Sequence, residues 1–194
     1  MYVRDAKNRE EVWLLDHIEA MGLDDTAFRS RDYVVAIDEE SHEKAGFGRI
    51  RIHKTDAGEY CELTSIGVLE EWEGQGVGAH IIERLVEYAS DEGFDVVYSL
   101  TNAAEYLVQF GFDPIEPAQL PDRLRERLTE KQESLQPDAV PLRLQVAEFE
   151  MPGRHRDRFK RAAAEDESAD EPEEGPEDFG IDPDEVTYKY DTGR

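Results

Sequence analysis

The alternation of hydrophobic and polar residues predicts strands and helices over roughly the first 150 positions of the chain. A period of two, or a short apolar run, indicates a strand, whereas apolar residues three or four positions apart indicate one face of a helix. We expect strands at residues 1–6, 33–38, 44–53, 59–69, 95–101 and 140–151. We expect helices at residues 8–23, 102–112 and 121–135, and a further helix that ends near residue 90. This order is not a regular strand–helix repeat, so it predicts a mixed sheet with helices on its faces, an α+β fold.

Turn and cap residues refine these elements. Asn8 or Asp5 should cap the first helix and Gly22 should end it. Gly111 should end the helix at 102–112, and the Asp-Ala-Gly stretch at 56–58 should join two strands into a hairpin. The buried helix faces are expected to comprise Val12, Leu15, Ile18 and Met21 or Leu23 in the first helix, and Leu124, Leu128 and Leu135 in the last.

The composition changes sharply near the end of the chain. Residues 162–184 are mostly Asp, Glu, Pro, Gly and Ala, which offer little to bury, so we expect this acidic tail to be disordered. Residues 154–161 (RHRDRFKR) form a basic cluster that could pair with the acidic tail or bind an acidic substrate or RNA. The expected organisation is therefore one folded domain at residues 1–151, followed by a basic and then acidic segment at 152–194.

The charge of the chain is strongly negative. Its 194 residues include 47 acidic and 22 basic side chains, which give a formal net charge of −25. Such a surface repels itself unless salt screens it, and at 1 M salt the Debye length is only about 3 Å. The composition is therefore typical of a salt-rich cytoplasm, as in halophilic archaea; an ordinary protein with an acidic tail is the alternative. Nucleic-acid binding is not expected of so acidic a chain.

Several classes of site are not expected. Cys61 is the single cysteine, so an internal disulfide or a cysteine-based zinc site is excluded, and a small strand residue is a simpler role for it than a nucleophile. The five histidines show no metal-ligand spacing, so we expect no metal. Nothing approaches the roughly 20 apolar residues of a membrane helix, and the first residues lack an apolar signal region. We expect a cytoplasmic protein without a membrane partner.

A glycine-rich loop leads directly into an amphipathic helix at residues 73–85 (EGQGVGAHIIERL). Such a loop, together with the unpaired N–H groups and the positive dipole end of a helix, forms a site for an anion such as phosphate. A tight strand-to-helix turn is the alternative. The Walker pattern is absent, and the dinucleotide pattern GxGxxG matches only loosely, without a regular parallel strand–helix–strand context.

These residues resemble the GNAT superfamily of acetyl-CoA-dependent N-acetyltransferases. The family's pyrophosphate loop reads Gln/Arg-x-x-Gly-x-Gly/Ala, and residues 73–78 match it except that Glu73 replaces the usual Gln or Arg. The stretch AAEYLVQFGF at 103–112 is similar to the family's second motif, a helix that ends in Gly-Phe. The resemblance covers residues 1–115 in the order of elements and is specific over 62–112. It implies a mixed, mostly antiparallel central sheet flanked by helices.

The resemblance also implies how acetyl-CoA is held as cosubstrate. In this family the third meander strand splays from its neighbour near a bulge, and the pantetheine arm enters the gap. Asn102 is similar to an Asn that contacts this arm, and it could also cap the helix that follows. The resemblance assigns the pyrophosphate to backbone groups of Gln75, Gly76, Val77, Gly78 and Ala79, and the thioester and arm to backbone groups of Ile66 and Val68.

Acetylation of an amine requires a neutral amine and a proton for the leaving thiolate. Glu62 lies on the same strand as the catalytic Glu of the histone-acetylating branch, so it is the candidate base; a solvated surface carboxylate is the alternative. The family's acid is a Tyr four residues before the Gly of Gly-Phe, where this chain has Leu107. Tyr106 is the nearest candidate acid, but a one-residue shift rotates a helical side chain by about 100°, so a core aromatic is the alternative.

The resemblance implies an enzyme that transfers the acetyl group of acetyl-CoA to a primary amine by direct attack. The acceptor could be a small metabolite, an amino acid, or a protein N-terminus or lysine. A non-catalytic acyl-CoA-binding regulatory module is the alternative, because Glu73 and Leu107 depart from the family pattern. Arg29 and Arg31 could hold a carboxylate of the acceptor or belong to a surface loop. A monomer and a homodimer are both compatible with the sequence.

The charge generates a first prediction. Lowering the salt below about 0.5 M should loosen the fold, because weaker screening leaves the carboxylates to repel one another. Circular dichroism across a KCl series measures this loss. A spectrum that stays unchanged down to millimolar salt would contradict the expected adaptation to salt.

Overall fold

The computed structural model describes residues 1–162, and the expected disorder of the acidic tail falls outside the described residues. Its strands are β1 (Tyr2–Asp5), β2 (Tyr33–Ile37), β3 (Lys44–Thr55), β4 (Gly58–Val68), β5 (Val96–Thr101), β6 (Asp113–Pro114) and β7 (Val140–Gln145). Its α-helices are α1 (Glu11–Ala20), α2 (Val77–Asp91), α3 (Ala104–Val108), α4 (Asp122–Ser134) and α5 (Gly153–Lys160). Short 3₁₀ turns lie at Asn8–Glu10, Ser30–Asp32, Glu70–Trp72, Pro117–Gln119 and Val146–Glu148.

One sheet organises these elements. Its strand order is β1-β2-β3-β4-β5-β7-β6, and every neighbouring pair is antiparallel except β4 and β5, which are parallel. The expected hairpin between β3 and β4 is present, with Thr55 opposite Gly58. The expectation of a mixed, mostly antiparallel sheet is therefore confirmed.

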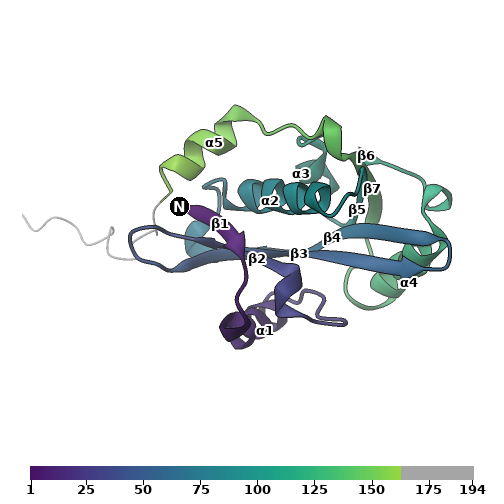
Figure 1. Cartoon of the computed structure of the whole chain (residues 1–194), viewed down its shortest axis with the longest axis horizontal. Coiled ribbons are helices and arrows are strands. Elements are labelled where there is room, and N and C mark those ends of the chain that lie inside the picture. Colours follow the sequence, from purple (N-terminus) through teal and green to yellow (C-terminus); the bar gives the residue numbers. More distant parts are fainter. Residues whose placement is uncertain (163–194) are drawn as a thin grey trace, which may run out of the picture. The chain divides into compact units, whose positions relative to one another are not determined.

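Helices cover both faces of the sheet, with α2 on one side and α1 and α4 on the other (Figure 1). The core on the α2 side joins Ile81, Ile82 and Leu85 to apolar residues of β2, β3 and β4. On the opposite side, Leu14 and Ile18 of α1 pack with a second apolar group that contains Phe47. Because side chains alternate along each strand, consecutive residues of β2 and β3 supply the two cores in turn.

Small residues on β3 allow α2 to approach the sheet closely. A Cβ atom on Gly48 would lie 2.5 Å from Cγ2 of Ile81, and one on Gly46 would lie 3.1 Å from Cδ1 of the same residue. Both distances are shorter than van der Waals contact. The glycines of the alternating stretch at 44–53 therefore fix the position of α2, whose first turn borders the site described below.

The first helix differs from the expectation. The chain forms a 3₁₀ turn at Asn8–Glu10 before α1 begins at Glu11, and neither Asp5 nor Asn8 caps it. The later start rotates the buried face: Leu14 and Ile18 are buried, whereas Val12 is 69% exposed. The predicted face was therefore only partly right. Of the residues predicted to form it, Ile18 alone is fully buried in the structure. Gly22 follows the helix with a φ of +62°, as expected for a helix stop.

Three further elements differ from their predictions. β7 ends at Gln145 and continues as a 3₁₀ turn, so the predicted strand at 140–151 was too long. In α4, Leu135 is exposed, although Leu124 and Leu128 are buried as expected. In α3, the N-cap residue is Ala103 and no side chain caps the helix, so Asn102 does not have the alternative role of a cap.

The basic cluster at 154–161 lies in α5, which contacts α2. Its His155 and Phe159 are buried, and the ring of Phe159 stacks on His80 of α2 at 3.7 Å between centroids. Arg156 forms an ion pair with Glu83 at 2.6 Å. Residues 1–162 belong to one compact unit. The helix is therefore docked on the domain, beside the glycine-rich loop.

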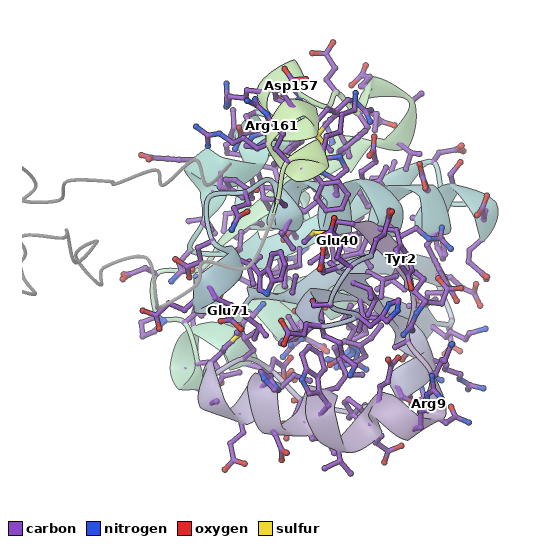
Figure 2. The ribbon with its side chains drawn as sticks, turned by 90° about the vertical axis from the view of Figure 1, so that its left-hand side faces the viewer. Tyr2, Arg9, Glu40, Glu71, Asp157 and Arg161 are labelled. Atoms are coloured by element: carbon purple, nitrogen blue, oxygen red, sulfur yellow. The ribbon has the colours of Figure 1, made fainter. Side chains whose placement is uncertain are left out.

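Exposed carboxylates are distributed over many elements. Glu40 lies in the turn between β2 and β3, Glu71 precedes the glycine-rich loop, and Asp157 lies on α5 (Figure 2). All three are exposed. The negative charge of the chain thus extends over the described residues and is not confined to the acidic tail.

Candidate active site

The glycine-rich loop adopts a conformation that requires glycine at its centre. Gly76 precedes the first turn of α2 with a φ of +81°, and Gly74 has a φ of +69°. A Cβ atom on Gly76 would also lie 2.4 Å from the carbonyl oxygen of His155 in α5. The first turn of α2, from Val77 onward, then presents backbone N–H groups that have no partner within the helix. This is the geometry of an anion-binding helix start.

β4 and β5 separate beside this loop. Their parallel pairing covers Cys61–Leu63 and Val97–Ser99 and extends no further, while β4 continues to Val68 in its pairing with β3. The register between β3 and β4 shifts between Phe47 and Arg49, and Ser65 adopts a φ of +50°. The Ser65 hydroxyl donates to the carbonyl oxygen of Asp24 at 2.7 Å. The expected bulge and splay are therefore both present.

The open edge of β4 carries the backbone groups expected to meet the cofactor arm. Just beyond the end of β4, the N–H of Leu69 donates to the carbonyl oxygen of Ala45 in β3. This hydrogen bond lies on the side of β4 that faces away from β5. Backbone groups alternate in direction along a strand. Those of Ile66 and Val68 therefore point to the opposite side, into the gap left by β5.

A cavity of about 420 Å³ fills this gap. It extends from Gly76 and Gly78 of the loop, along Ile66 and Val68, to a polar end at Thr64 and Lys131. Five of the predicted cofactor residues line the cavity: Ile66, Val68, Gly76, Val77 and Gly78.

The remaining predicted cofactor residues lie beside the cavity. The Gln75 side-chain amide donates to the carbonyl oxygen of Glu71 at 3.2 Å. Ala79 is buried in the core, so only its backbone is available to a ligand. Asn102 is exposed just beyond the end of β5. None of these three lines the cavity, and their contacts with a cofactor stay predictions.

A cation from α5 contacts the glycine-rich loop. Glu73 and Arg158 both line the mouth of the cavity, and Nη1 of Arg158 donates to the carbonyl oxygen of Gly74 at 3.3 Å. Sequence reasoning did not place α5 here, because the fold had to bring two segments 84 residues apart into contact. The available signal was the basic cluster itself, which is unusual in so acidic a chain.

Tyr106 is not a core residue: it is 37% exposed and lines the cavity near the loop. Its hydroxyl lies 3.3 Å from the Cβ position of Gly78, and its ring meets Phe110 edge to face at 5.3 Å. Burial raises the pKa of the Tyr106 phenol. Leu107, at the family's Tyr position, also lines the cavity and is almost fully buried. The one-residue shift thus places the phenol at the loop end of the cavity.

Glu62 is fully buried beneath the polar end of the cavity. Its Oε2 lies 2.7 Å from Nε2 of His53 and 3.6 Å from Nε of Arg127, and Arg127 also forms an ion pair with Asp24. Glu62 does not line the cavity. The solvated surface carboxylate is therefore excluded, and a role as base stays a prediction that requires an intermediary.

Lys131 of α4 occupies the point where β4 and β5 part. Its ammonium donates to the carbonyl oxygen of Leu100 at 2.6 Å and lies 3.3 Å from Oγ1 of Thr64. Burial lowers the pKa of Lys131 to about 8, against the opposing effect of the Glu62 carboxylate; Arg127 and Arg51 lower it further. An ammonium with a pKa near neutrality, exposed to a cavity, is suited to proton transfer.

Sequence reasoning missed Lys131 because it followed only the leucines of the last helix. Leu124, Arg127, Leu128 and Lys131 are spaced three, one and three residues apart, so all four share the buried face. Charged residues at core positions of an amphipathic helix were the available signal. Cys61, in contrast, is fully buried, and burial raises the pKa of its thiol to about 12, which suits a packing role.

Comparisons with known proteins identify the family. The model of the acetyltransferase (GNAT) family matches residues 2–112, which is more than half of the chain. The chain belongs to the GNAT acetyltransferase family. The match includes β4, the glycine-rich loop, α2 and α3, which supply part of the cavity lining. No group of three potential metal ligands occurs among residues 1–162, and no helix in that range is long and apolar enough to cross a membrane.

Individual relatives are more distant than the family match. An uncharacterized N-acetyltransferase of Chlorobaculum tepidum is 30% identical over 64 residues, which cover 33% of this chain and 41% of that protein. The N-acetylglutamate synthase of Neisseria gonorrhoeae, solved with coenzyme A and N-acetyl-glutamate, has a TM-score of 0.59 at 15% identity and covers 74% of this chain. This chain spans only 34% of that synthase chain. Rv2747 of Mycobacterium tuberculosis, solved with CoA, has a TM-score of 0.59 at 18% identity, over 75% of this chain and 99% of that one.

The pKa of Lys131 gives a prediction about stability. Its pKa is about 8 in the folded chain and 10.5 in the reference state, so between these values only the unfolded chain binds the proton. Folded stability should therefore rise with pH over this window, and the penalty should be complete below pH 8. Relative to Lys131→Met, the wild type should gain roughly 2–3 kcal/mol in unfolding free energy between pH 7 and pH 10.

Denaturant unfolding at constant salt measures this difference. Lys160→Met is the matched control, because it makes the same substitution at an exposed lysine that does not line the cavity. If the unfolding free energies of wild type and Lys131→Met change in parallel between pH 7 and pH 10, the pKa of Lys131 is not lowered in the folded chain.

Proposed function

We propose that this chain transfers the acetyl group of acetyl-CoA to a primary amine. The observation that supports the proposal is the cavity that joins the glycine-rich loop to the splayed ends of β4 and β5, in a chain of the GNAT family. The relatives from Neisseria gonorrhoeae and Mycobacterium tuberculosis were solved with coenzyme A. Their identity with this chain is too low for their acceptors to be transferred to it.

The cofactor would follow the cavity from end to end. The loop and the first turn of α2, from Gln75 to Ala79, would hold the pyrophosphate through backbone N–H groups. The pantetheine arm would lie along Ile66 and Val68 as an added strand, because these backbone groups point into the gap. Arg158 would offset the unfavourable charge of Glu73 at the phosphates. Tyr106, beside Gly78, is placed to contact the arm near the phosphates.

The thioester would then reach the polar end of the cavity at Thr64 and Ser65. A backbone N–H of the bulged strand can stabilise the oxyanion that forms when the amine attacks the thioester carbonyl. Ser65 is held at an unusual φ by its hydrogen bond to the loop after α1, so the donors of this segment are positioned before the cofactor binds. Water exclusion by the buried surroundings strengthens such an interaction.

Lys131 is the group best placed to move the proton. The amine nitrogen forms a bond to the acetyl carbon, and the tetrahedral intermediate collapses as the C–S bond breaks. The Lys131 ammonium donates a proton to the departing thiolate, and the neutral lysine then accepts the proton that the new amide nitrogen releases. The net result moves one proton from amine to sulfur. Glu62 acts here as a positioning residue that holds Arg127 and His53, and its charge favours the ammonium form of Lys131.

We also propose that the protein works in a salt-rich cytoplasm. The support is the formal charge of −25 together with exposed carboxylates over many elements of the described chain. Activity measurements therefore belong in molar KCl, where the surface charges are screened.

Cofactor binding is tested at Gly78. Gly78→Asp should lose the thermal stabilisation by acetyl-CoA, because it places a carboxylate beside the proposed phosphate site. Gly78→Ala should retain it, since its Cβ meets Tyr106 and Val68 at 3.3 and 3.4 Å, which small movements accommodate. Stabilisation follows the logarithm of ligand concentration over Kd, so a melting-temperature titration reports affinity. Equal responses from both variants, or no response from the wild type at millimolar acetyl-CoA, would refute the proposed site.

Proton transfer is tested at Lys131. Lys131→Met should keep the stabilisation by acetyl-CoA but release CoA with amine acceptors about 10²–10⁴ times more slowly. The ratio of the wild-type rate to the variant rate should fall above about pH 8 as the ammonium is lost, because the titration of the acceptor amine is common to both proteins and cancels. Lys131→Arg should not rescue the rate, because a guanidinium does not give up its proton. A Lys131→Met rate equal to wild type would assign the proton to water or another group.

A further inference from the structure

A second cavity, of about 450 Å³, lies on the opposite face of the sheet from α2. It is formed by the loop after α1, by β3 and by the start of α4. Its polar lining is basic throughout: Arg29, Arg49, Arg51, His53, Lys54 and Arg123. The other lining residues are Ala27, Phe28 and Ile52, so no carboxylate lines this basic cavity.

This lining is unexpected from the composition. The chain has more than twice as many acidic as basic side chains, yet every formally charged residue in the lining is basic. The arginines come from three separate segments, so the fold has gathered them. Concentrating cations in one hollow costs repulsion. Carboxylates beside the hollow offset part of this cost, and an anion inside it would offset more.

The cations of the lining have partners beside the basic cavity, but two of their donors do not. Lys54 pairs with Glu59 at 2.9 Å, His53 lies 2.7 Å from Glu62, and Arg123 pairs with Glu126 at 3.2 Å. Arg49 donates to the carbonyl oxygens of Thr26 and Ala27. Asp32 pairs with Arg29 at 2.9 Å and lies 3.5 Å from Arg49, and Asp24 lies 3.9 Å from Arg51. Nε of Arg49 and Nη1 of Arg51 are nevertheless buried without a hydrogen-bond acceptor in the described structure. Arg49 is 1% exposed, so this donor is isolated from water. Buried donors that lack a partner point to a ligand that supplies one.

The basic cavity lies one strand away from the proposed reaction centre. Arg49 on β3 is directly opposite Thr64 on β4, and Arg51 is opposite Glu62. Thr64 lines the cofactor cavity beside Lys131. Cα atoms of opposite residues are about 5 Å apart in antiparallel strands. A compact molecule could therefore place an amine at Thr64 and a second group among the arginines.

We propose that the basic cavity binds an oxyanion of the acceptor, so that the acceptor is a compact amine carrying a carboxylate or a phosphate. This inference rests on the proposed acetyl transfer. Arginine presents paired N–H donors that match either oxyanion in a bidentate arrangement, and Arg49 and Arg51 provide two such groups. Of the two loop arginines considered from the sequence, Arg29 lines the cavity and Arg31 does not.

Matched pairs of amines test the proposal in CoA-release assays at constant KCl. Each pair compares an amine that carries an oxyanion, the anionic member, with an analogue of similar length that lacks one, the neutral member: β-alanine with propylamine, and O-phosphoethanolamine with ethanolamine. The anionic members should show at least a tenfold higher kcat/KM. The carboxylate and phosphate pairs identify which oxyanion is preferred. A wild type that favours the neutral members would overturn the proposal.

Variants tie the preference to the basic cavity. Arg51→Gln and Arg123→Gln should each reduce the preference about tenfold, mainly through KM, while stabilisation by acetyl-CoA is retained. Arg125→Gln is the control on the same helix, because Arg125 pairs with Asp122 and does not line the cavity. A preference that survives in both lining variants would also overturn the proposal.

Two outcomes separate this inference from the function on which it rests. If the wild type is not stabilised by acetyl-CoA, the proposed function fails. If acetyl-CoA stabilises the chain but no amine reacts, thermal stabilisation by the anionic amines alone decides the inference. Stabilisation that is lost in Arg51→Gln supports the basic cavity, and no stabilisation by any anionic member refutes it.

Discussion

The parting of β4 from β5 is the constraint on which the site depends. The parallel ladder stops at Leu63 and Ser99, and a bulge at Ser65 turns the remainder of β4 away. Backbone groups that would otherwise pair between strands are thereby left for a ligand. The glycine-rich loop continues from the same strand, so its position is set by the same bend. Loss of this single irregularity would close the sheet and remove the cavity.

The fold also buries charged groups beneath the gap between β4 and β5. Asp24, Glu62, Arg127 and Lys131 are all at most 5% exposed. Burial of an isolated charge is costly, and these groups offset the cost by pairing with one another and with backbone carbonyls. Such an arrangement contributes little to stability. Its value is that a titratable ammonium is held at a fixed point between two strands.

The local pattern of the chain was sufficient to predict most elements and the glycine-rich loop. Alternation along β3 and the Gly-to-helix transition at α2 are encoded by neighbouring residues, so they are legible without a structure. The splay between β4 and β5 was also predicted without a structure, but from the family resemblance. The face of α1 was misjudged because a 3₁₀ turn shifted its start, and element boundaries depend on hydrogen bonds that a sequence does not display.

The parts of the site that escaped prediction are made by tertiary contact. Lys131 reaches Thr64 across 67 positions of sequence, and Arg158 reaches Gly74 across 84. Tyr106 was uncertain because a single-residue offset on a short helix decides which surface it faces. The basic cavity combines three segments, and only the arginines of the first had been considered. These features required the fold before they could be recognised.

The docking of α5 has a consequence for the dynamics of the loop. The backbone of His155 fills the space that a side chain on Gly76 would occupy, so the loop and α5 constrain each other. Opening of the loop therefore requires α5 to move, and the two should open as one unit with a single local free energy. A ligand that orders the loop would slow amide hydrogen exchange in α5 as well, although it touches only one end of that helix. Occupancy of the loop is thus transmitted to the segment that precedes the acidic tail.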